Sequence, residues 1–256
     1  MRAQFRPLLL ASTKMFYRSL DTVWFAAVSP FLLLAIFTLV KHLRYGLAHG
    51  AGTIGFFTFT AIGFAAFIAA HFNQDGIVGT ASGYRAQGVL KRIAATPISP
   101  TVFILAQVLV RLAVGLVQTL AFLAAAAALG AHLTYSTELL LVLPAATLAL
   151  LTGTGFGFAI AGLTRSPEAA NQLNITLFTP VFLLAGVQYP LEGLPAPLPH
   201  IAKYAVPFAS PIQLFRDAVA GHIGGDLAYL LLASIAWLAA ALALAVRSYR
   251  LDERTV

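Results

Sequence analysis

The segment Gln87–Pro100 carries the residues best suited to bind another molecule. It reads QGVLKRIAATPISP, is basic at Lys91 and Arg92, is broken by Pro97, and lies between two long apolar runs. Its ammonium, guanidinium and hydroxyl groups offer charge-assisted hydrogen bonds rather than a nucleophile or a set of metal ligands. The segment therefore predicts a contact surface for a second molecule.

The other reactive residues form no recognisable catalytic set. The sequence has no cysteine, which excludes disulfides and thiolate chemistry. No stretch reads G-x-x-x-x-G-K-[ST], the phosphate cradle that ATP binding requires, and no nucleophile–base pair stands out. The six histidines are scattered without the H-x-x-x-H spacing of a helical metal site: His42, His49, His71, His132, His200 and His222. We therefore expect no catalytic, cofactor-binding or metal-ligating residue in this chain.

A further group of polar residues falls inside the apolar runs. Arg111 lies about ten residues into the third run, which is about 15 Å along a helix. A charge at that depth faces protein or water, or its side chain extends to the interface. A structural contact or such an extended side chain is favoured for Arg111 over substrate binding. Interhelical hydrogen bonds are favoured over a polar path for Gln107, Gln118, Asn171, Gln172 and Asn174.

The composition identifies the environment that must position these groups. Of 256 residues, 59% are hydrophobic and 10% are charged, whereas soluble domains average about 25% charged residues. The chain is therefore expected to be an integral membrane protein with a single membrane domain over residues 1–256. The net charge of +7 does not imply nucleic acid, because the basic residues lie in short loops and at the termini, where membrane topology and lipid headgroups explain them.

Six apolar runs are long enough to cross a membrane, and they predict an all-α fold with six transmembrane helices. A spanning helix needs about 20 mostly apolar residues for a hydrocarbon layer of roughly 30 Å. The runs are Val23–Val40, Thr53–His71, Thr101–Leu129, Leu139–Leu163, Ala169–Val187 and Leu227–Val246. In the fourth run, close helix packing explains four small residues: Gly153, Gly155, Gly157 and Gly162.

The lysine and arginine residues predict the orientation. Eleven of them fall on one side, where the positive-inside rule places the cytoplasm: Arg2, Arg6, Lys14, Arg18, Arg85, Lys91, Arg92, Arg165, Arg247, Arg250 and Arg254. Four fall on the other side: Lys41, Arg44, Lys203 and Arg216. Both termini are therefore expected in the cytoplasm, in agreement with an even number of spans. No secretory signal is visible, because the first apolar run is long and lacks a small-residue cleavage site.

Residues 1–21 predict an interfacial helix on the cytoplasmic leaflet. With Pro7 in the first turn, a 3.6-residue period places Lys14 and Arg18 opposite an apolar face made of Leu8, Leu9, Met15, Phe16 and Leu20. The alternative is an ordinary positive-inside flank that happens to be helical.

The loop between the second and third runs predicts a short surface helix. Ser82 could cap a helix from Gly83 to Ala95, and Pro97 would end it because proline cannot continue the hydrogen-bond ladder. Such a helix could transmit a push from a partner to two membrane helices. A capped helix in a positive-inside loop without any partner is the alternative, and the residues alone do not decide between the two.

The proline-rich segment over residues 190–211 predicts re-entrant helices before the last span. Six of the thirteen prolines lie between Pro190 and Pro211, and the stretch Leu191–Ser210 is apolar but too short to cross. Irregular backbone near membrane depth is tolerated where it is buried in protein or lines a wet cavity. Helices that close the outer end of a transport path fit this pattern, and an exposed extracellular loop is the alternative.

Two motifs carry a family resemblance. Residues Gly88–Pro100 resemble the G-T-L-x-R-L-x-x-T-P-x-S signature of ABC-2 type permeases, the membrane subunits of ABC exporters for drugs, lipids and polysaccharides. Residues Leu184–Pro195, LAGVQYPLEGLP, are similar to the family's L-S-G-x-x-F-P-L-E-x-L-P segment, and the similarity continues to Arg216–Asp217. With six runs and the N-terminal amphipathic segment, the resemblance covers essentially the whole chain.

The resemblance implies roles for both motifs. It implies that the first forms a coupling helix that docks on a separate ATPase, through Tyr84, Arg85, Gly88, Leu90, Lys91, Arg92, Thr96 and Pro97. It implies that the second forms an external gate, through Gly186, Pro190, Leu191, Glu192, Leu194 and Pro195. Relatives often carry glutamates just before the signature glycine, but Ala86 and Gln87 stand here, so roles of those acidic positions are not transferred.

The resemblance also implies the assembly. A second permease copy, in a homodimer, and two ATPase subunits that bind ATP and Mg are expected, in the plasma membrane of a bacterial or archaeal cell. The predicted function is export of an amphiphilic drug, lipid or glycan. A secondary transporter or channel that works without an ATPase is the alternative, but no internal repeat or paired intramembrane charges favour it. An intramembrane enzyme is disfavoured by the lack of an acid–base or metal set.

Overall fold

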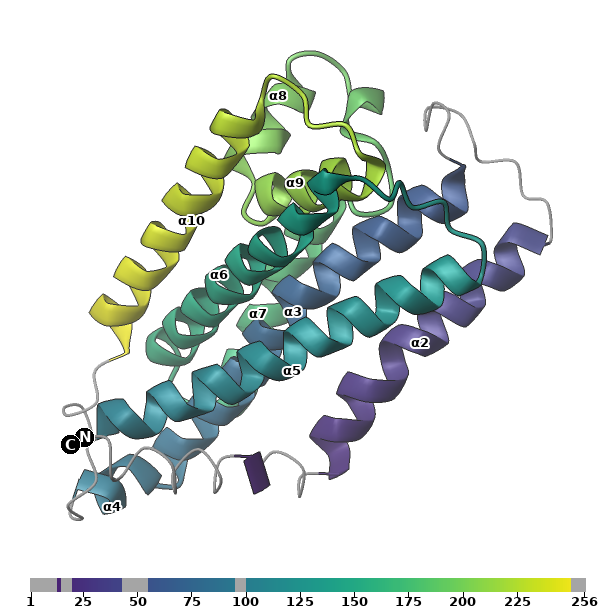
Figure 1. Cartoon of the computed structure of the whole chain (residues 1–256). Coiled ribbons are helices and arrows are strands. Elements are labelled where there is room, and N and C mark those ends of the chain that lie inside the picture. Colours follow the sequence, from purple (N-terminus) through teal and green to yellow (C-terminus); the bar gives the residue numbers. More distant parts are fainter. Residues whose placement is uncertain (1–12, 15–19, 43–54, 95–99, 250–256) are drawn as a thin grey trace.

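The computed structural model describes residues 13–14, 20–42, 55–94 and 100–249, and within these ranges all regular elements are helices (Figure 1). The expected all-α fold is therefore confirmed for the described chain. The longer helices are α2 (Leu20–His42), α3 (Phe56–Ala86), α5 (Pro100–Ala128), α6 (Val142–Leu163), α7 (Pro167–Leu184) and α10 (Leu227–Ser248). The shorter ones are α4 (Val89–Ala94), α8 (Leu198–Ala205), α9 (Ala209–Ala220) and the 3₁₀ turns Thr137–Leu141 and Leu191–Gly193.

Four helical segments are long and apolar enough to cross a membrane: Phe56–Ala86, Val102–Ala128, Thr137–Leu163 and Leu227–Ser248. Six spans were expected. In α2 the apolar stretch among the described residues is the shorter segment Val28–Leu39. Helix α7 has 18 residues and carries amide side chains at Asn171, Gln172 and Asn174.

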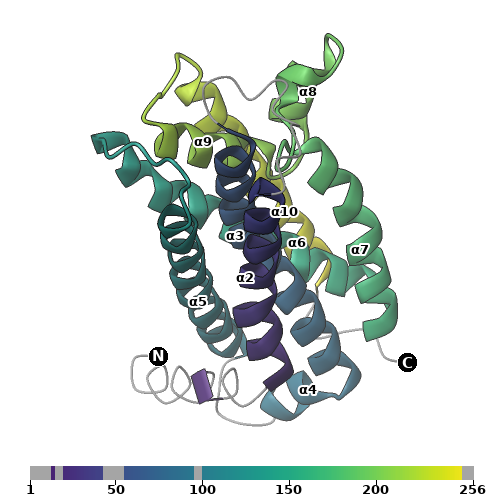
Figure 2. The ribbon, with the colours of Figure 1, turned by 90° about the vertical axis from the view of Figure 1, so that its right-hand side faces the viewer.

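Helix α3 is the centre of the bundle. It contacts α2, α5, α6, α7 and α9, and most of its residues are buried. The long helices run side by side, with α4 at one end and α8 and α9 at the other (Figures 1 and 2). We call these the α4 end and the α9 end. Residues of α3 can therefore reach groups on most other helices.

Close packing of α6 brings it against α3 on one face and α10 on the other. A Cβ atom added at Gly153 would overlap the carbonyl oxygen of Ala70, and one at Gly157 would lie 2.8 Å from the carbonyl oxygen of Gln74. At Gly155 the same atom would lie 2.8 Å from Cβ of Ala241. The expected role of these glycines in helix packing is confirmed.

The helix that contains the second predicted span is longer than that span. Helix α3 does not end at His71 but continues to Ala86, and α4 has six residues instead of the expected Gly83–Ala95. Ser82 does not cap a helix, because its hydroxyl donates to the carbonyl oxygen of Val78 (2.6 Å) within α3. The polar residues after His71 stay in the bundle because they find partners on neighbouring helices, as described below.

The expected interfacial helix over residues 1–21 lies largely outside the described residues. The proline-rich segment forms short helices at the α9 end, and α9 extends ten residues beyond Ser210 to Ala220. Most of α9 is buried, and it contacts α3, α6, α8 and α10. The segment is therefore packed into protein at this end of the bundle.

Candidate functional site

Arg85, in the last turn of α3, binds the end of α6. Its Nη1 donates to the carbonyl oxygens of Ala161 (2.8 Å) and Gly162 (3.4 Å), and its Nη2 donates to that of Thr164. The last carbonyl groups of a helix lack partners within the helix and attract cations. Arg85 therefore joins the end of α3 to the connection between α6 and α7.

A tight turn at Gln87–Gly88 separates α3 from α4. Gly88 has φ 64°, in the left-handed region where a residue with a Cβ atom is strained. Its N–H donates to the carbonyl oxygen of Arg85 (3.2 Å). The exposed Arg92 of α4 donates from Nη2 to the carbonyl oxygen of Gln87 (2.6 Å). The direction of α4 relative to α3 is thus fixed by Gly88 and by the Arg92 side chain.

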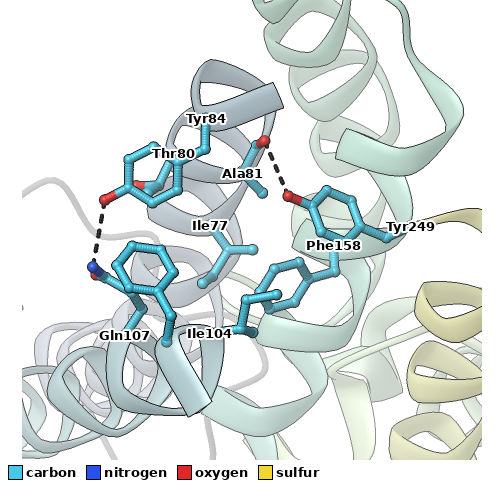
Figure 3. Close-up of a pocket in the computed structure, with 9 residues that line it drawn as sticks. Ile77, Thr80, Ala81, Tyr84, Ile104, Gln107, Phe158 and Tyr249 are labelled. Carbon is cyan, nitrogen blue, oxygen red and sulfur yellow. Dashed lines mark hydrogen bonds between the residues drawn. The ribbon is translucent and has the colours of Figure 1, made fainter. Parts of the chain in front are cut away.

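A small apolar pocket lies beside this turn (Figure 3). Its walls come from α3, α5, α6 and the residue after α10: Ile77, Thr80, Ala81, Tyr84, Phe103, Ile104, Gln107, Phe158 and Tyr249. Gln107 donates from Nε2 to the hydroxyl of Tyr84 (3.4 Å), and the Tyr249 hydroxyl donates to the carbonyl oxygen of Ala81 (3.3 Å). Burial raises the pKa of Tyr249 to about 12, so this hydroxyl keeps its proton at neutral pH.

A second site runs along the contact between α3 and α7. Phe67, His71 and Asp75 recur every four residues on α3, and Asn174, Phe178 and Phe182 recur every four residues on α7. Because a four-residue spacing keeps side chains on one side of a helix, the two sets form facing rows. We call these six residues the α3–α7 seam.

The end of the seam nearer α4 is polar. Gln74, which is 3% exposed, donates from Nε2 to Oδ1 of Asn174 (2.8 Å). This bond fixes the side-chain amide of Asn174, which is 1% exposed, so that its Nδ2 donates to Oδ1 of Asp75 (3.1 Å). Asp75 itself is exposed, and the one ion pair among the described residues is elsewhere, between Lys203 and Asp226. An oriented carboxylate therefore faces outward from the bundle at this point.

The rest of the seam is aromatic. The ring of His71 stacks on Phe178 with centroids 4.1 Å apart and 19° between the planes. Phe67 contacts both Phe178 (4.9 Å) and Phe182 (4.6 Å). His71, Phe67 and Phe182 are partly exposed. A row of ring faces and edges therefore leads from the carboxylate toward the α9 end.

The α5 side of α3 carries a buried arginine. Arg111 is 5% exposed, and its Nη2 donates to the hydroxyl of Thr80. A Cβ atom at Gly76 would overlap the guanidinium, so the missing side chain makes room for it. The Arg111 side chain therefore lies between α3 and α5.

One predicted gate residue at the α9 end, Gly186, binds a second buried arginine. Arg216 is 6% exposed, donates from Nη2 to the carbonyl oxygens of Gly186 (2.8 Å) and Val187 (3.3 Å), and lies 3.8 Å from the ring centroid of Phe59. Gly186 has φ 73° and packs against the buried Leu191. Pro190 precedes the 3₁₀ turn, Leu194 is half-buried, and Glu192 and Pro195 are exposed.

Comparison with known families agrees with this architecture. The model of the ABC-2 type transporter family matches residues 3–220. The chain belongs to this family. A search among curated proteins found no match to it. The family and the apolar helices together identify a multi-pass membrane protein that is a component of a transporter, and the resemblance noted in the sequence is confirmed.

In this ABC-2 family member, the predicted coupling residues do not form one surface. Gly88 and Arg92 lie at the turn and on α4, whereas Tyr84 lines the pocket and Arg85 points to α6. The backbone of α4 includes Leu90 and Lys91, but their side chains lie outside the described part of the chain. Thr96 and Pro97 fall outside it as well. A docking role for this set stays a prediction.

The predicted intramembrane polar residues of this ABC-2 protein also separate. Asn174 is buried in the seam, Asn171 is exposed one turn away on α7, and Gln118 is buried on α5. Sequence reasoning missed Asp75, Gln74 and the burial of Arg216. The signal for Asp75 was the four-residue spacing from Phe67 and His71, which continues the helix past the predicted end of the span.

Proposed function

We propose that the chain is the permease subunit of an ABC exporter and is driven by a separate ATPase subunit. The observation that carries this proposal is the family match over residues 3–220 of a chain without the G-x-x-x-x-G-K-[ST] motif. A transporter of this family that lacks a phosphate cradle needs a partner that binds ATP and Mg.

In this proposal the α4 end faces the cytoplasm of a bacterial or archaeal cell. The excess of lysine and arginine in the segments at that end supports the orientation, with both termini on the same side. Helices α2 and α7 complete six spans, and α8 and α9 form the re-entrant outer segment. Burial of α9 against α3, α6 and α10 supports this role, because buried irregular backbone is tolerated at membrane depth.

The ATPase docks on α4 and on the turn at Gln87–Gly88. Arg85 couples the movement of the docked α4 to two helices, since it belongs to α3 and donates hydrogen bonds to the carbonyl groups at the end of α6. A displacement of α4 would therefore move α3 directly and the connection between α6 and α7 through Arg85. In this mechanism Arg85 acts inside the permease and does not contact the ATPase.

The working unit contains two permease copies and two ATPase subunits. The substrate is an amphiphile such as a drug, a lipid or a glycan conjugate, and it leaves through a path between the permease copies.

Reconstitution tests the proposal. The permease is co-purified with candidate ATPases, placed in proteoliposomes, and assayed for ATP-dependent movement of a fluorescent phospholipid and of a fluorescent lipophilic dye. Transport is expected with the ATPase and should cease when the lysine of the ATPase's phosphate cradle is replaced. Transport by the permease alone at the same rate would contradict the proposal and favour a secondary transporter or channel.

A further inference from the structure

We propose that the α3–α7 seam binds lipophilic organic cations, with Asp75 as the counter-ion of the positive group and the aromatic rings as its apolar wall. This inference rests on the proposed function in one respect, namely that the chain carries an amphiphile. It adds the charge of that amphiphile and the residue that recognises it.

The position of Asp75 makes it unusual. It is the single acidic residue in the sequences of α3, α5, α6 and α10. At about 1.5 Å per residue, its 19-residue distance from Phe56 corresponds to about 28 Å along α3, close to the roughly 30 Å thickness of the hydrocarbon layer. With Phe56 at one edge of this layer, Asp75 lies at the opposite edge, where the charged end of an amphiphile in the leaflet at the α4 end would lie.

The carboxylate is held in position by buried groups. Asn174 and Gln74 are almost completely buried. The side-chain amide of Gln74 donates a hydrogen bond to Asn174, and that of Asn174 donates one to Asp75, so each amide orients the next side chain. Burying two amides is costly unless they are hydrogen-bonded, so this arrangement is a defined feature of the fold. It leaves one face of the Asp75 carboxylate open outward.

The aromatic side chains supply the second half of the site. An organic cation is attracted both by a carboxylate and by ring faces within about 6 Å, and its apolar substituents gain from contact with the rings. Here the rings of His71, Phe178 and Phe67 follow the carboxylate in order toward the α9 end. A molecule with a positive end and an apolar body matches this order when it lies parallel to the helices.

The other charged group nearby lies on a different side of α3. Arg111 interacts electrostatically with Asp75 but bonds to Thr80 and packs against Gly76, between α3 and α5. It therefore does not occupy the seam, which presents a negative group and aromatic rings. An anionic amphiphile would find no lysine or arginine among the six seam residues.

A binding experiment without any ATPase tests the site. The full chain is placed in lipid nanodiscs, and the affinities for tetraphenylphosphonium and tetraphenylborate are measured. These two probes have nearly the same shape and opposite charges. Asp75→Asn keeps the acceptor oxygen for Asn174 and removes the charge, so it should weaken tetraphenylphosphonium binding by about tenfold and leave tetraphenylborate binding unweakened.

Glu168→Gln is the matched control. Glu168 is an exposed acid in the first turn of α7, on the same helix as the seam, and its neutralisation should change neither affinity. Phe67→Leu should lower the affinity for both probes, because it removes a partly exposed ring and keeps the carboxylate. Equal tetraphenylphosphonium affinity in Asp75→Asn and the unaltered protein would overturn the proposal. A parallel loss of both probes in Asp75→Asn would also overturn it.

These outcomes are separate from those of the reconstitution. If the seam does not discriminate charge but ATP-driven transport of the phospholipid persists, the site is wrong and the permease function stands. If Asp75 controls tetraphenylphosphonium binding but transport needs no ATPase, the site stands and the function is wrong.

Discussion

The two buried arginines differ in what they hold. Arg216, at the α9 end, bonds to the backbone carbonyl groups of Gly186 and Val187 and lies on the ring of Phe59. Arg111, toward the α4 end, bonds to the side-chain hydroxyl of Thr80. Backbone groups at a buried turn cannot move without moving the chain, whereas a hydroxyl can rotate. The comparison indicates that the contact of Arg216 at the α9 end is more rigid than the contact of Arg111 with α3.

The difference extends to the glycines of α3 that face these arginines. A Cβ atom at Gly63 would overlap the backbone carbonyl of Val187 as well as the Arg216 side chain. At Gly76 the atoms it would meet all belong to the Arg111 side chain. Both contacts use a missing side chain to admit a guanidinium, but a side chain can shift and a backbone carbonyl cannot do so cheaply.

Replacing Arg216 should have the largest effect. Arg216→Met leaves two buried carbonyl oxygens without their donor and removes the contact with Phe59, at an expected cost of about 3 kcal/mol in the free energy of unfolding. Arg111→Met should cost less, because water or a rotated Thr80 hydroxyl can compensate. Thermal unfolding in detergent compares the two. A larger drop in melting temperature for Arg111→Met would reverse the assignment of the rigid end.

The paired glycine variants sharpen the same comparison. Gly63→Ala forces a backbone contact apart and is expected to destabilise by about 1–3 kcal/mol, while Gly76→Ala should cost less because Arg111 can shift. Gly79→Ala is the control, since an added Cβ atom there meets nothing within 4 Å. Melting temperatures should rank Gly79→Ala highest and Gly63→Ala lowest. Equal values for Gly63→Ala and Gly76→Ala would show that both neighbours yield equally.

The next variant tests the α4 end through transport activity. Arg85→Gln removes the charge that bonds to the end of α6, with an expected stability cost of about 1 kcal/mol because the side chain is half-exposed. With the ATPase bound, transport per ATP hydrolysed should fall while co-purification of the ATPase persists. Loss of co-purification would instead assign Arg85 to docking. Arg92→Gln, at an exposed position on α4, is the comparison for direct docking.

The smallest effect is expected from the surface ion pair at the α9 end. Lys203 donates to Asp226 (2.8 Å) and joins α8 to the start of α10. The hydrogen bond and charge of Lys203 lower the pKa of Asp226, so the contribution exists above the ordinary pKa of an aspartate and is lost as the pH falls through the lowered value. Lys203→Gln should change the melting temperature less than Arg216→Met, Arg111→Met or Arg85→Gln, at neutral pH and in low salt.

The sequence predicted those helices whose bounds are set by neighbouring residues in the chain. The predicted spans Thr101–Leu129 and Leu227–Val246 differ from α5 and α10 by at most two residues at either end, because long apolar runs bounded by Pro100 and Asp226 define them. The full length of α3 was not predicted, because its polar residues form hydrogen bonds with distant partners. Asn73 donates to the carbonyl oxygen of Leu150, 77 residues away, and Gln74 to Asn174, 100 residues away. No local pattern contains those contacts.

The site residues also divide into those predicted by local motifs and those set by distant contacts. Gly88 and Gly186 were identified by motif, and both have the positive φ values that glycine accommodates. Arg216 was counted among the external loop residues, although it is buried on Phe59, 157 residues earlier in the chain. Charge and position along the sequence indicated the side of the membrane but carried no information about which ring would cover the guanidinium.

Helix α3 differs from its neighbours α2 and α7 in one more respect. Both neighbours contain an internal proline, Pro30 and Pro180, which removes a backbone hydrogen bond and lets a helix bend. The 31 residues of α3 contain none. A displacement of Ala86 along the axis therefore meets no proline before Phe56, about 45 Å away. In mechanical terms α3 lacks the proline hinges of its two neighbours, so a movement that begins at α4 would bend α2 at Pro30 and α7 at Pro180.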